Sequence, residues 1–384
     1  MFSALTAFSP QKLKIIPLIC NIQDEDKINE ILKVFNVDTV YHSAAYKHVP
    51  IVESNICEGI KNNIFGTYKV AKACIAQNVS DFVLVSSDKA VRSTSVMGAS
   101  KRLAELCVQG LYHQLKNPKI KMAIVRFGNV LGSSGSVIPK FKKQINEGGP
   151  ITLTHLNVTR FFMTITEAAQ LVIQAGAMSK KCDVFILDMG EPISIKELIY
   201  NIVSLSGLSV KDEENPEGDI EIKITGLRPG EKLYEELLLG DNPQETDHEK
   251  IQKANDPFIP LSQLDNHLNV LSSLITNNSV LEVKNILKKI IFVQMKKLLP
   301  LLIILHCISI NAQTTINGGS VSGTWTKAKS PYKITSSINI DAGDTLFIEP
   351  GVKVEFSNKV GVYVRGSLKA NGAAGDSINF TIEP

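Results

Sequence analysis

Residues 81–102 read DFVLVSSDKAVRSTSVMGASKR, and this stretch indicates the fold of the chain. Phe82 to Val85 is a short apolar run bounded by polar residues, which is typical of a strand buried on both faces of a parallel sheet. Four polar residues follow at once: Ser86, Ser87, Asp88 and Lys89. Open α/β sheets bind ligands at the carboxyl ends of their strands. The stretch therefore predicts an α/β fold with reactive side chains at that edge.

A helix is predicted to begin near Met97, and Lys101 lies four residues further on, which places both side chains on one helical face. The pattern SSDK followed by MxxxK resembles the active site of extended short-chain dehydrogenase/reductases, which act on a sugar hydroxyl beside NAD. The nearest resemblance is to CapD-type polysaccharide biosynthesis proteins, which are NAD-dependent UDP-N-acetylglucosamine 4,6-dehydratases. It covers about Leu13 to Ile251 and implies a Rossmann-like parallel sheet with a small substrate-binding subdomain.

The resemblance also implies a lyase reaction in capsule, O-antigen or glycan biosynthesis. NAD would take hydride from C4 of the hexose, water would leave across C5 and C6, and the hydride would return to C6. Ser87 would hydrogen-bond the C4 oxygen, with Ser86 on the cofactor side, and Lys101 would orient the nicotinamide ribose. Asp88 would protonate the departing C6 hydroxyl. Lys89 would be the base at C5, provided that burial and nearby positive charge lower its pKa.

Met97 stands where the reductases have tyrosine, and a thioether cannot deprotonate the C4 hydroxyl. Asp88 or a chain of waters must then do so, and the sequence leaves both routes open. Two other functions also stay open. One is a nucleotide-sugar epimerase or reductase on the same scaffold, which would need tyrosine at position 97 and no Asp-Lys pair. The other is an inactive fragment that binds UDP-sugar weakly or not at all.

The segment before the second predicted strand carries expected cofactor contacts. Leu13–Ile19 is predicted to be a strand, and the spacing of apolar residues predicts an amphipathic helix over Asp24–Phe35. Asn21 and Ile22 stand between them, where the family has an Asp-hydrophobic pair that contacts the adenine of NAD. The resemblance therefore assigns both residues to cofactor binding.

Thr39–Ala45 is predicted to be the next strand. It ends in the small residues Ala44 and Ala45, as expected where backbone approaches a dinucleotide closely. The following residues match the family segment AAYKHVP, which makes Lys47 a candidate contact to substrate. Asn63 lies in the family pattern NNxxGT, on a helix, and would organise the cofactor-side network.

The first twelve residues contain no glycine, whereas the family begins with a GxxGxxG turn that holds the pyrophosphate at a helix N-terminus. We therefore expect the sheet to lack its first strands and the chain to be an N-terminally truncated form. The strand at Thr39–Ser43 would then expose an edge built for burial. This predicts weak stability and weak binding of NAD, which micromolar affinity would refute.

Three further segments match the substrate side of the family. The loop Arg126–Pro139 contains Asn129, a candidate for the diphosphosugar, and Val137, which would lie along the nucleotide. In the segment TRFFMT, Arg160 would face phosphate. In GLRPGEK, Arg228 would pair with the diphosphate and Glu231 with the ribose hydroxyls, because guanidinium binds phosphate oxygens bidentately and carboxylate accepts from vicinal hydroxyls.

Composition narrows the class of partner. Forty-one basic and thirty-eight acidic residues leave a charge of +3, so we expect no nucleic-acid partner. The six cysteines have irregular spacings, which favours a reduced compartment and no metal site. We expect a cytoplasmic enzyme. Three further properties stay open: a location at the inner face of the cytoplasmic membrane, membrane association of the parent enzyme, and a homo-oligomeric state.

Sequence character changes towards the C-terminus. Residues 1–253 are predicted to form the dehydratase domain, with the substrate lobe mainly at 129–170 and 186–253, and 254–294 to form a helical tail. Residues 295–313 have the basic, apolar and small-residue layout of a signal peptide, too short for a confident membrane span. Residues 314–384 predict short strands with frequent turns and resemble the start of a secreted parallel β-helix. We therefore expect two neighbouring reading frames joined near Met295, although an internal helix between two domains is the alternative.

Overall fold

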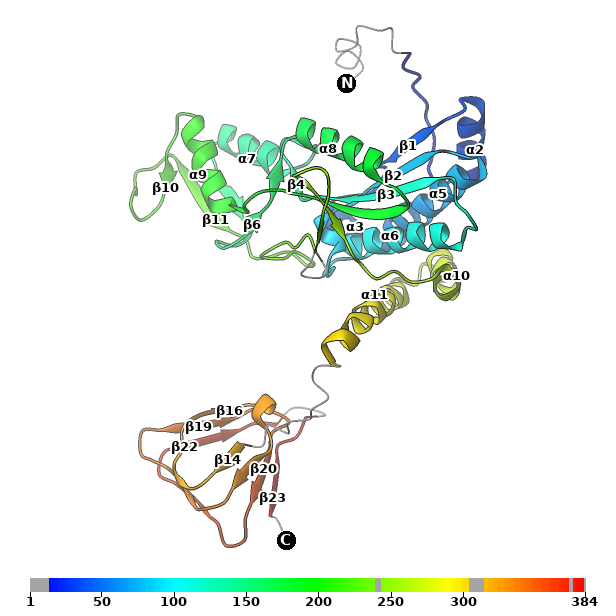
Figure 1. Cartoon of the computed structure of the whole chain (residues 1–384). Helices are drawn as coiled ribbons and strands as arrows, with labels where there is room; N and C mark the ends of the chain where they lie inside the picture. The colour runs from blue at the N-terminus through cyan, green and yellow to red at the C-terminus, as the bar shows by residue number, and fades with distance from the viewer. Residues whose placement is uncertain (1–13, 239–242, 304–313, 373–375, 383–384) are drawn as a thin grey trace. The chain divides into compact units, whose positions relative to one another are not determined.

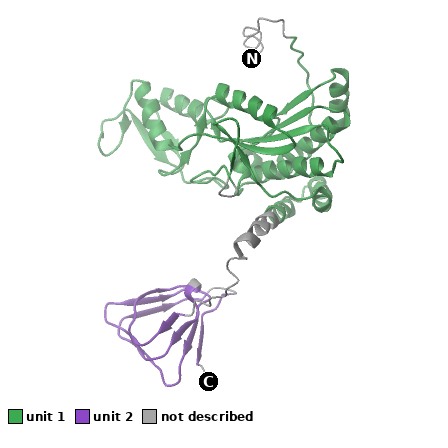
Figure 2. Ribbon diagram, in the orientation of Figure 1, with its two compact units in different colours: residues 1–299 green, residues 300–384 purple. Residues whose placement is uncertain are grey.

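The structure of the chain, a computed structural model, describes residues 14–238, 243–303, 314–372 and 376–382. It divides into two compact units, residues 1–299 and 300–384 (Figure 2). Each unit has its own hydrophobic core.

The first unit is built on a six-stranded sheet of order β1-β2-β3-β8-β13-β12 (Figure 1). The first four strands are parallel, β13 runs antiparallel to β8, and β12 runs antiparallel to β13. Their bounds are β1 Thr39–His42, β2 Asp81–Val85, β3 Lys121–Arg126, β8 Cys182–Leu187, β12 Gln244–Glu245 and β13 Ile251–Ala254.

Alternate residues of β2 enter different cores, so the sheet is covered on both faces. Phe82 and Leu84 join the core formed with α5 (Thr67–Ala76), α6 (Val96–Gln114) and α10 (Leu261–Thr276). Val83 joins a second core with α8 (Ile165–Met178). The predicted Rossmann-like α/β fold is therefore confirmed, and the buried strand Phe82–Val85 lies in the middle of its parallel part.

A smaller subdomain has a third core of its own. Its helices are α7 (Val137–Asn146) and α9 (Ile195–Leu205), and its parallel sheet has the order β10-β11-β5. The strands of this sheet are β5 Ile151–Leu153, β10 Val210–Lys211 and β11 Ile220–Ile224. Two further pairs of short strands lie between the subdomain and the main sheet. They are β4 Asn129–Val130 with β7 Phe162–Met163, and β6 Thr159–Arg160 with β9 Ile193–Ser194.

The remaining helices of the first unit surround the site or follow it. They are α2 Glu25–Val34, α3 Val49–Ser54, α4 Ile56–Ile60, the π-helix η1 Lys61–Gly66, the 3-10 helix η2 Asp88–Ala90 and α11 Val280–Ile303. The helix predicted over Asp24–Phe35 is confirmed as α2, with the Asp24 side chain as its N-cap.

The strand predicted at Leu13–Ile19 is wrong for the part of it that the structure describes, since residues 14–19 form no strand. Leu18 and Ile19 are exposed. The reason lies in β1, which pairs only with β2 and forms the edge of the sheet among the described strands. The next predicted strand, Thr39–Ala45, is confirmed over Thr39–His42. Its predicted position at an edge of the sheet agrees with its place among the described strands.

The second unit winds ten short strands into three parallel sheets, β14-β17-β20-β23, β15-β18-β21 and β16-β19-β22. Each circuit of the chain adds one strand to each sheet, which confirms the β-helix character expected of this segment (Figure 1). The bounds are β14 Thr314–Ile316, β15 Gly319–Ser320, β16 Gly323–Trp325, β17 Tyr332–Ile334, β18 Ile338–Ile340, β19 Thr345–Ile348, β20 Lys353–Phe356, β21 Val362–Val364, β22 Ser367–Ala370 and β23 Asn379–Ile382, with the 3-10 helix η3 at Lys327–Lys329.

The segment with the layout of a signal peptide falls partly within α11, and residues 304–313 lie outside the described residues. None of the helices in the described ranges combines the length and the apolar character needed to cross a membrane.

Candidate active site

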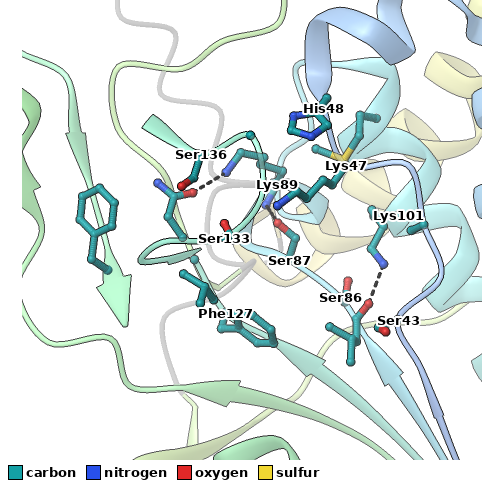
Figure 3. A pocket seen from close by; sticks show the side chains of 18 of the residues that line it. Ser43, Lys47, His48, Ser86, Ser87, Lys89, Lys101, Phe127, Ser133 and Ser136 are labelled. Carbon is teal, nitrogen blue, oxygen red and sulfur yellow. Dashed lines mark hydrogen bonds between the residues drawn. The ribbon is translucent and has the colours of Figure 1, made fainter. Parts of the chain in front are cut away.

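A cavity of about 390 Å³ opens at the carboxyl ends of β1, β2 and β3. Figure 3 shows Lys47, Ser87 and Lys89 reaching into it. Nine of the residues singled out from the sequence line its wall: Ala45, Lys47, Ser86, Ser87, Lys89, Met97, Lys101, Asn129 and Val137. Segments far apart in the chain therefore converge here, as the order of a parallel sheet requires.

A second cavity, of about 200 Å³, adjoins the first and shares Lys47, His48 and Lys89 with it. Arg160, Arg228 and Glu231 line this second cavity. Lysine and arginine side chains thus outnumber carboxylates around it, which suits a dianionic diphosphate. A polar path links the Ser-Asp-Lys cluster to the GLRPGEK segment.

Ser87, Asp88 and Lys89 point toward one another at the end of β2. The Ser87 hydroxyl donates to Oδ1 of Asp88 at 2.7 Å, and Nζ of Lys89 donates to the same oxygen at 3.1 Å. The backbone N–H of Lys89 donates to it as well, at 2.8 Å, within the single turn of η2. Asp88 is only 1% exposed and is absent from both cavity walls. It therefore reaches a bound molecule through Ser87 and Lys89.

The expectation that the pKa of Lys89 falls is wrong. Burial acts to lower the pKa, but Asp88 and Glu235 together raise it above the ordinary lysine value. Nζ of Lys89 lies 3.4 Å from Oε1 of Glu235 and 3.4 Å from Oδ1 of Asn129. Lys89 is accordingly an ammonium ion held between two carboxylates in the resting site.

Met97 and Lys101 do lie on one face of α6, whose N-cap is Ser95. Met97 is buried at 3% exposure, and Nζ of Lys101 donates to the carbonyl oxygen of Val85 at 2.6 Å. Burial lowers the pKa of Lys101 to about 8. Lys101 therefore keeps most of its positive charge at neutral pH, at the carboxyl end of β2.

Asn63 is buried and lines neither of the two cavities, but it holds a loop of the site in place. Its amide donates to the Tyr46 carbonyl at 3.0 Å and to the Ser100 hydroxyl at 2.9 Å, and its oxygen accepts from the Tyr46 N–H at 2.8 Å. Asn63 thus ties the loop that carries Lys47 to helix α6. The hydrogen-bond network expected around Asn63 therefore supports the loop that carries Lys47.

Other predicted cofactor residues lie elsewhere. Asn21, Ile22 and Ala44 line neither of the two cavities. The side chain of Asn21 accepts from the backbone N–H of Gln23 at 2.9 Å, and Ile22 packs against Gly66. Ser86, by contrast, lines the first cavity, but its hydroxyl donates to Glu105 at 2.5 Å and so is directed into the protein.

On the substrate side, Arg160 is already engaged. Its guanidinium donates to the carbonyls of Thr159, Lys232 and Leu233 at 2.7 to 2.9 Å, which fastens the segment after GLRPGEK to the wall. Arg228 is exposed, and its backbone N–H donates to Glu231 at 3.2 Å. Arg228 is therefore better placed than Arg160 to meet a phosphate.

The sequence gives no signal for two features of the site. Glu235 is 4% exposed in its side chain beside Lys89, in a segment of unremarkable composition. Arg126, at the start of the expected substrate loop, is fully buried and pairs with Glu105 and Asp256. Burial acts to raise the pKa of Glu105, but Arg126 and Arg102 hold it at about 2. Such a network depends on residues 130 positions apart and has no local pattern.

Fold and site together define a Rossmann-like α/β protein with a basic, two-part cleft at the carboxyl edge of its sheet. The chain belongs to a family described as polysaccharide biosynthesis protein, whose model matches residues 3–256.

Three curated relatives are informative. Capsular polysaccharide biosynthesis protein CapD of Staphylococcus aureus is 45% identical over 71% of this chain and 44% of its own length. A UDP-N-acetylglucosamine 4,6-dehydratase (inverting) of Campylobacter jejuni is 29% identical over 66% of this chain and 71% of its own length. A UDP-glucose 4-epimerase of Rickettsia massiliae is 32% identical over 63% and 66%. The chain thus spans less than half of CapD.

Two solved structures share the fold. Pen from Bacillus thuringiensis has a TM-score of 0.55 and 38% identity, with 62% of this chain and 71% of that chain covered. DesIV, a dTDP-glucose 4,6-dehydratase from Streptomyces venezuelae with NAD and TYD bound, has a TM-score of 0.52 and 20% identity over 64% and 80% of the two chains.

Proposed function

We propose that the first unit acts in the dehydration of a UDP-N-acetylhexosamine, UDP-GlcNAc, to the UDP-4-keto-6-deoxy sugar with transient reduction of NAD. The observation that carries the proposal is the hydrogen-bonded cluster of Ser87, Asp88 and Lys89, in which Ser87 lines the first cavity and Lys89 lines both. Family membership and the dehydratase relative support it. The place of such a reaction is the cytoplasm, where capsule and glycan precursors are assembled.

The residues present fit the nicotinamide end of NAD. A cavity lined by the small residues Ser43 and Ala45 and by the Lys101 ammonium lies at the carboxyl ends of the parallel strands, where dinucleotides bind in such sheets. Lys101 would hold the nicotinamide ribose. Bound NAD would supply the reversible hydride acceptor for the sugar carbons, as it is carried by the solved DesIV.

Ser87 and Asp88 provide a route for the C4 hydroxyl proton. Ser87 donates to Asp88 and can accept from a sugar hydroxyl in the cavity, so a proton from C4 would pass through Ser87 to the carboxylate. This contact favours Asp88 over a chain of waters and removes the need for tyrosine at position 97. The same proton would then reach the departing C6 hydroxyl, which leaves as water.

The rest of the nucleotide sugar has matching groups. Asn129 and Val137 lie on the wall of the first cavity, where Asn129 would meet the diphosphosugar and Val137 the nucleotide. Lys47 and Arg228 would hold the diphosphate, and Glu231 would accept from the ribose hydroxyls. Lys89 stands between the two cavities and is the base for the C5 proton.

The proposal is tested by incubating the full chain with UDP-GlcNAc and NAD in large excess and following the nucleotide sugar by mass spectrometry and by proton NMR, which distinguishes C4 epimers of equal mass. A product lighter by one water, with a 4-keto group, is expected. A C4 epimer of unchanged mass would instead establish the epimerase, which the Rickettsia relative makes the second candidate. Intact substrate would favour the inactive fragment.

Lys89→Met should stop loss of the C5 proton and reduce formation of the keto sugar by about 100-fold or more, because general-base catalysis contributes on that order. Exchange of the C5 hydrogen in deuterium oxide, followed by NMR, measures the step directly. Lys250→Met is the matched control, since Lys250 pairs with Glu167 at the surface. Unchanged exchange in Lys89→Met would remove Lys89 from this role.

A further inference from the structure

Glu235 occupies an unusual position for a carboxylate. Its side chain is 4% exposed and lines the second cavity, with Oε1 at 3.4 Å from Nζ of Lys89 and 3.8 Å from Nε of Arg160. Its other oxygen, Oε2, is buried and has no hydrogen-bond partner among the described residues. A buried carboxylate oxygen without a partner carries a large desolvation cost and readily takes a proton.

Lys89 cannot accept a proton from carbon while it is an ammonium ion. Its side chain is 24% exposed and touches three side-chain acceptors, Asp88, Asn129 and Glu235. Oδ1 of Asp88 already accepts from Ser87 and from the backbone and Nζ of Lys89, whereas its buried Oδ2, like Oε2 of Glu235, has no hydrogen-bond partner among the described residues. Asp88 is nevertheless occupied, because it receives the C4 hydroxyl proton in the proposed first step. The Asn129 amide does not take protons in this range. Glu235 is the remaining group that can relieve Lys89 of its proton.

We propose that Glu235 takes the proton of Lys89 and returns it, so that Lys89 is a neutral amine only while the C5 proton is transferred. This inference rests on the proposed dehydration. Every proton in this scheme has a donor and an acceptor. The C4 hydroxyl proton goes to Asp88 and leaves in water with the C6 oxygen. The Lys89 proton moves to Glu235, the amine takes the C5 proton, and the ammonium so formed returns one of its three equivalent protons to C5. Glu235 then returns the stored proton to the amine.

The transfer is coupled to the first step by charge. When Asp88 is neutralised by the C4 proton, the Lys89 ammonium loses one of its two carboxylate partners, and its hold on the proton weakens. Arg160 and Lys232 face Glu235 and favour its charged form, whereas Asp88 disfavours it. Burial is the largest influence and raises the pKa of Glu235. In this role Glu235 is a positioning residue that acts through Lys89.

The titration of Lys89 tests this without turnover. The full-length protein is labelled at a series of pH values with a trace of acetic anhydride, and acetylation of Lys89 is read by peptide mass spectrometry. In Glu235→Gln, the midpoint for Lys89 should fall by about one pH unit, because a negative charge in direct contact is lost. Glu236→Gln is the matched control: its carboxylate pairs with Arg92 and Lys232 and should leave the midpoint unchanged.

Glu235→Asp withdraws the carboxylate by one methylene and should lower the Lys89 midpoint by a smaller amount. This variant allows the same test if Glu235→Gln does not fold. An unchanged Lys89 midpoint in both variants would overturn the proposal. Turnover is measured in parallel: exchange of the C5 hydrogen should fall in Glu235→Gln and recover partly in Glu235→Asp. Normal exchange in Glu235→Gln would also overturn it. A shifted midpoint in a protein that makes no keto sugar would retain the Lys89–Glu235 pair and reject the dehydration.

Discussion

At the scale of single residues, the site is governed by what surrounds two lysines. Both stand on the wall of the first cavity, yet their proton affinities are displaced in opposite directions. Lys101 is buried beside a neutral carbonyl, and its pKa falls to about 8. Lys89 is half-buried between two carboxylates, and its pKa rises. The same residue type thus gives an amine that discharges in mild base and an ammonium that does not.

Lys101 should therefore make stability depend on pH. Its folded pKa of about 8 lies below that of the unfolded chain, so between these values the unfolded chain binds more protons and stability rises with pH. Relative to Lys101→Met, the wild type should gain about 2 kcal/mol between pH 8 and pH 10. Urea denaturation of both proteins across this range measures the difference. A constant difference would show that Lys101 titrates normally.

At the scale of elements, the site depends on the approach of α6 to the short helix η2. Gly98 lies in the first turn of α6, and a Cβ there would fall well within contact distance of the carbonyl oxygen of Lys89. The neighbouring atoms are backbone, which cannot rotate away. Gly98 thus allows the close contact that holds Lys89 against Asp88.

Gly98→Ala should destabilise the first unit by about 2 kcal/mol, because overpacking against backbone outweighs the gain in helix propensity. Gly110→Ala is the matched control in the same helix: its Cβ would meet Leu261 at 3.3 Å, and its stability should stay within about 1 kcal/mol of wild type. Chemical denaturation compares the two. Equal stabilities would mean that η2 moves freely away from α6.

At the scale of the whole molecule, the two units have separate cores. The network of Arg102, Glu105, Arg126 and Asp256 is buried within the first unit. The second unit closes around residues such as Ile334, which is fully buried between its sheets. Among the described residues, each core is made only of residues of its own unit, so each unit should unfold in its own transition.

Calorimetry of the full chain should show two transitions. Glu105→Gln should lower the free energy of unfolding of the first unit by about 3 to 5 kcal/mol, because two buried guanidinium groups then share Asp256 as their remaining carboxylate. Ile334→Ala should lower only that of the second unit, by about 2 to 5 kcal/mol, through loss of core packing. Movement of both transitions by either change would show that the units fold as one.

The edge position of β1 also bears on cofactor binding. Its outer side has no partner strand among the described residues, and Asn21 and Ile22 line neither cavity. Weak binding of NAD by the chain stays a prediction on these grounds. Titration of the chain with NAD by calorimetry checks it.

Local pattern was sufficient for the first two parallel strands, β1 and β2, the helix after Asp24, the β-helical C-terminal unit and the meeting of Ser87, Lys89, Met97 and Lys101 at one edge. Each of these follows from periodicity or from the rule that parallel strands end together, which act over short stretches of chain. The strand expected before Cys20 failed because a strand needs a neighbour, which its own residues cannot supply.

The charge states at the site had a different origin. The raised pKa of Lys89 depends on the adjacent Asp88 and on Glu235, which is distant in sequence. The bond from Arg160 to the Leu233 carbonyl and the pairing of Arg126 with Asp256 also join residues far apart in the chain. Electrostatic effects depend on separation in space and on burial, and neither is written in the spacing of residues along the chain. Folding alone brought these groups within reach of one another.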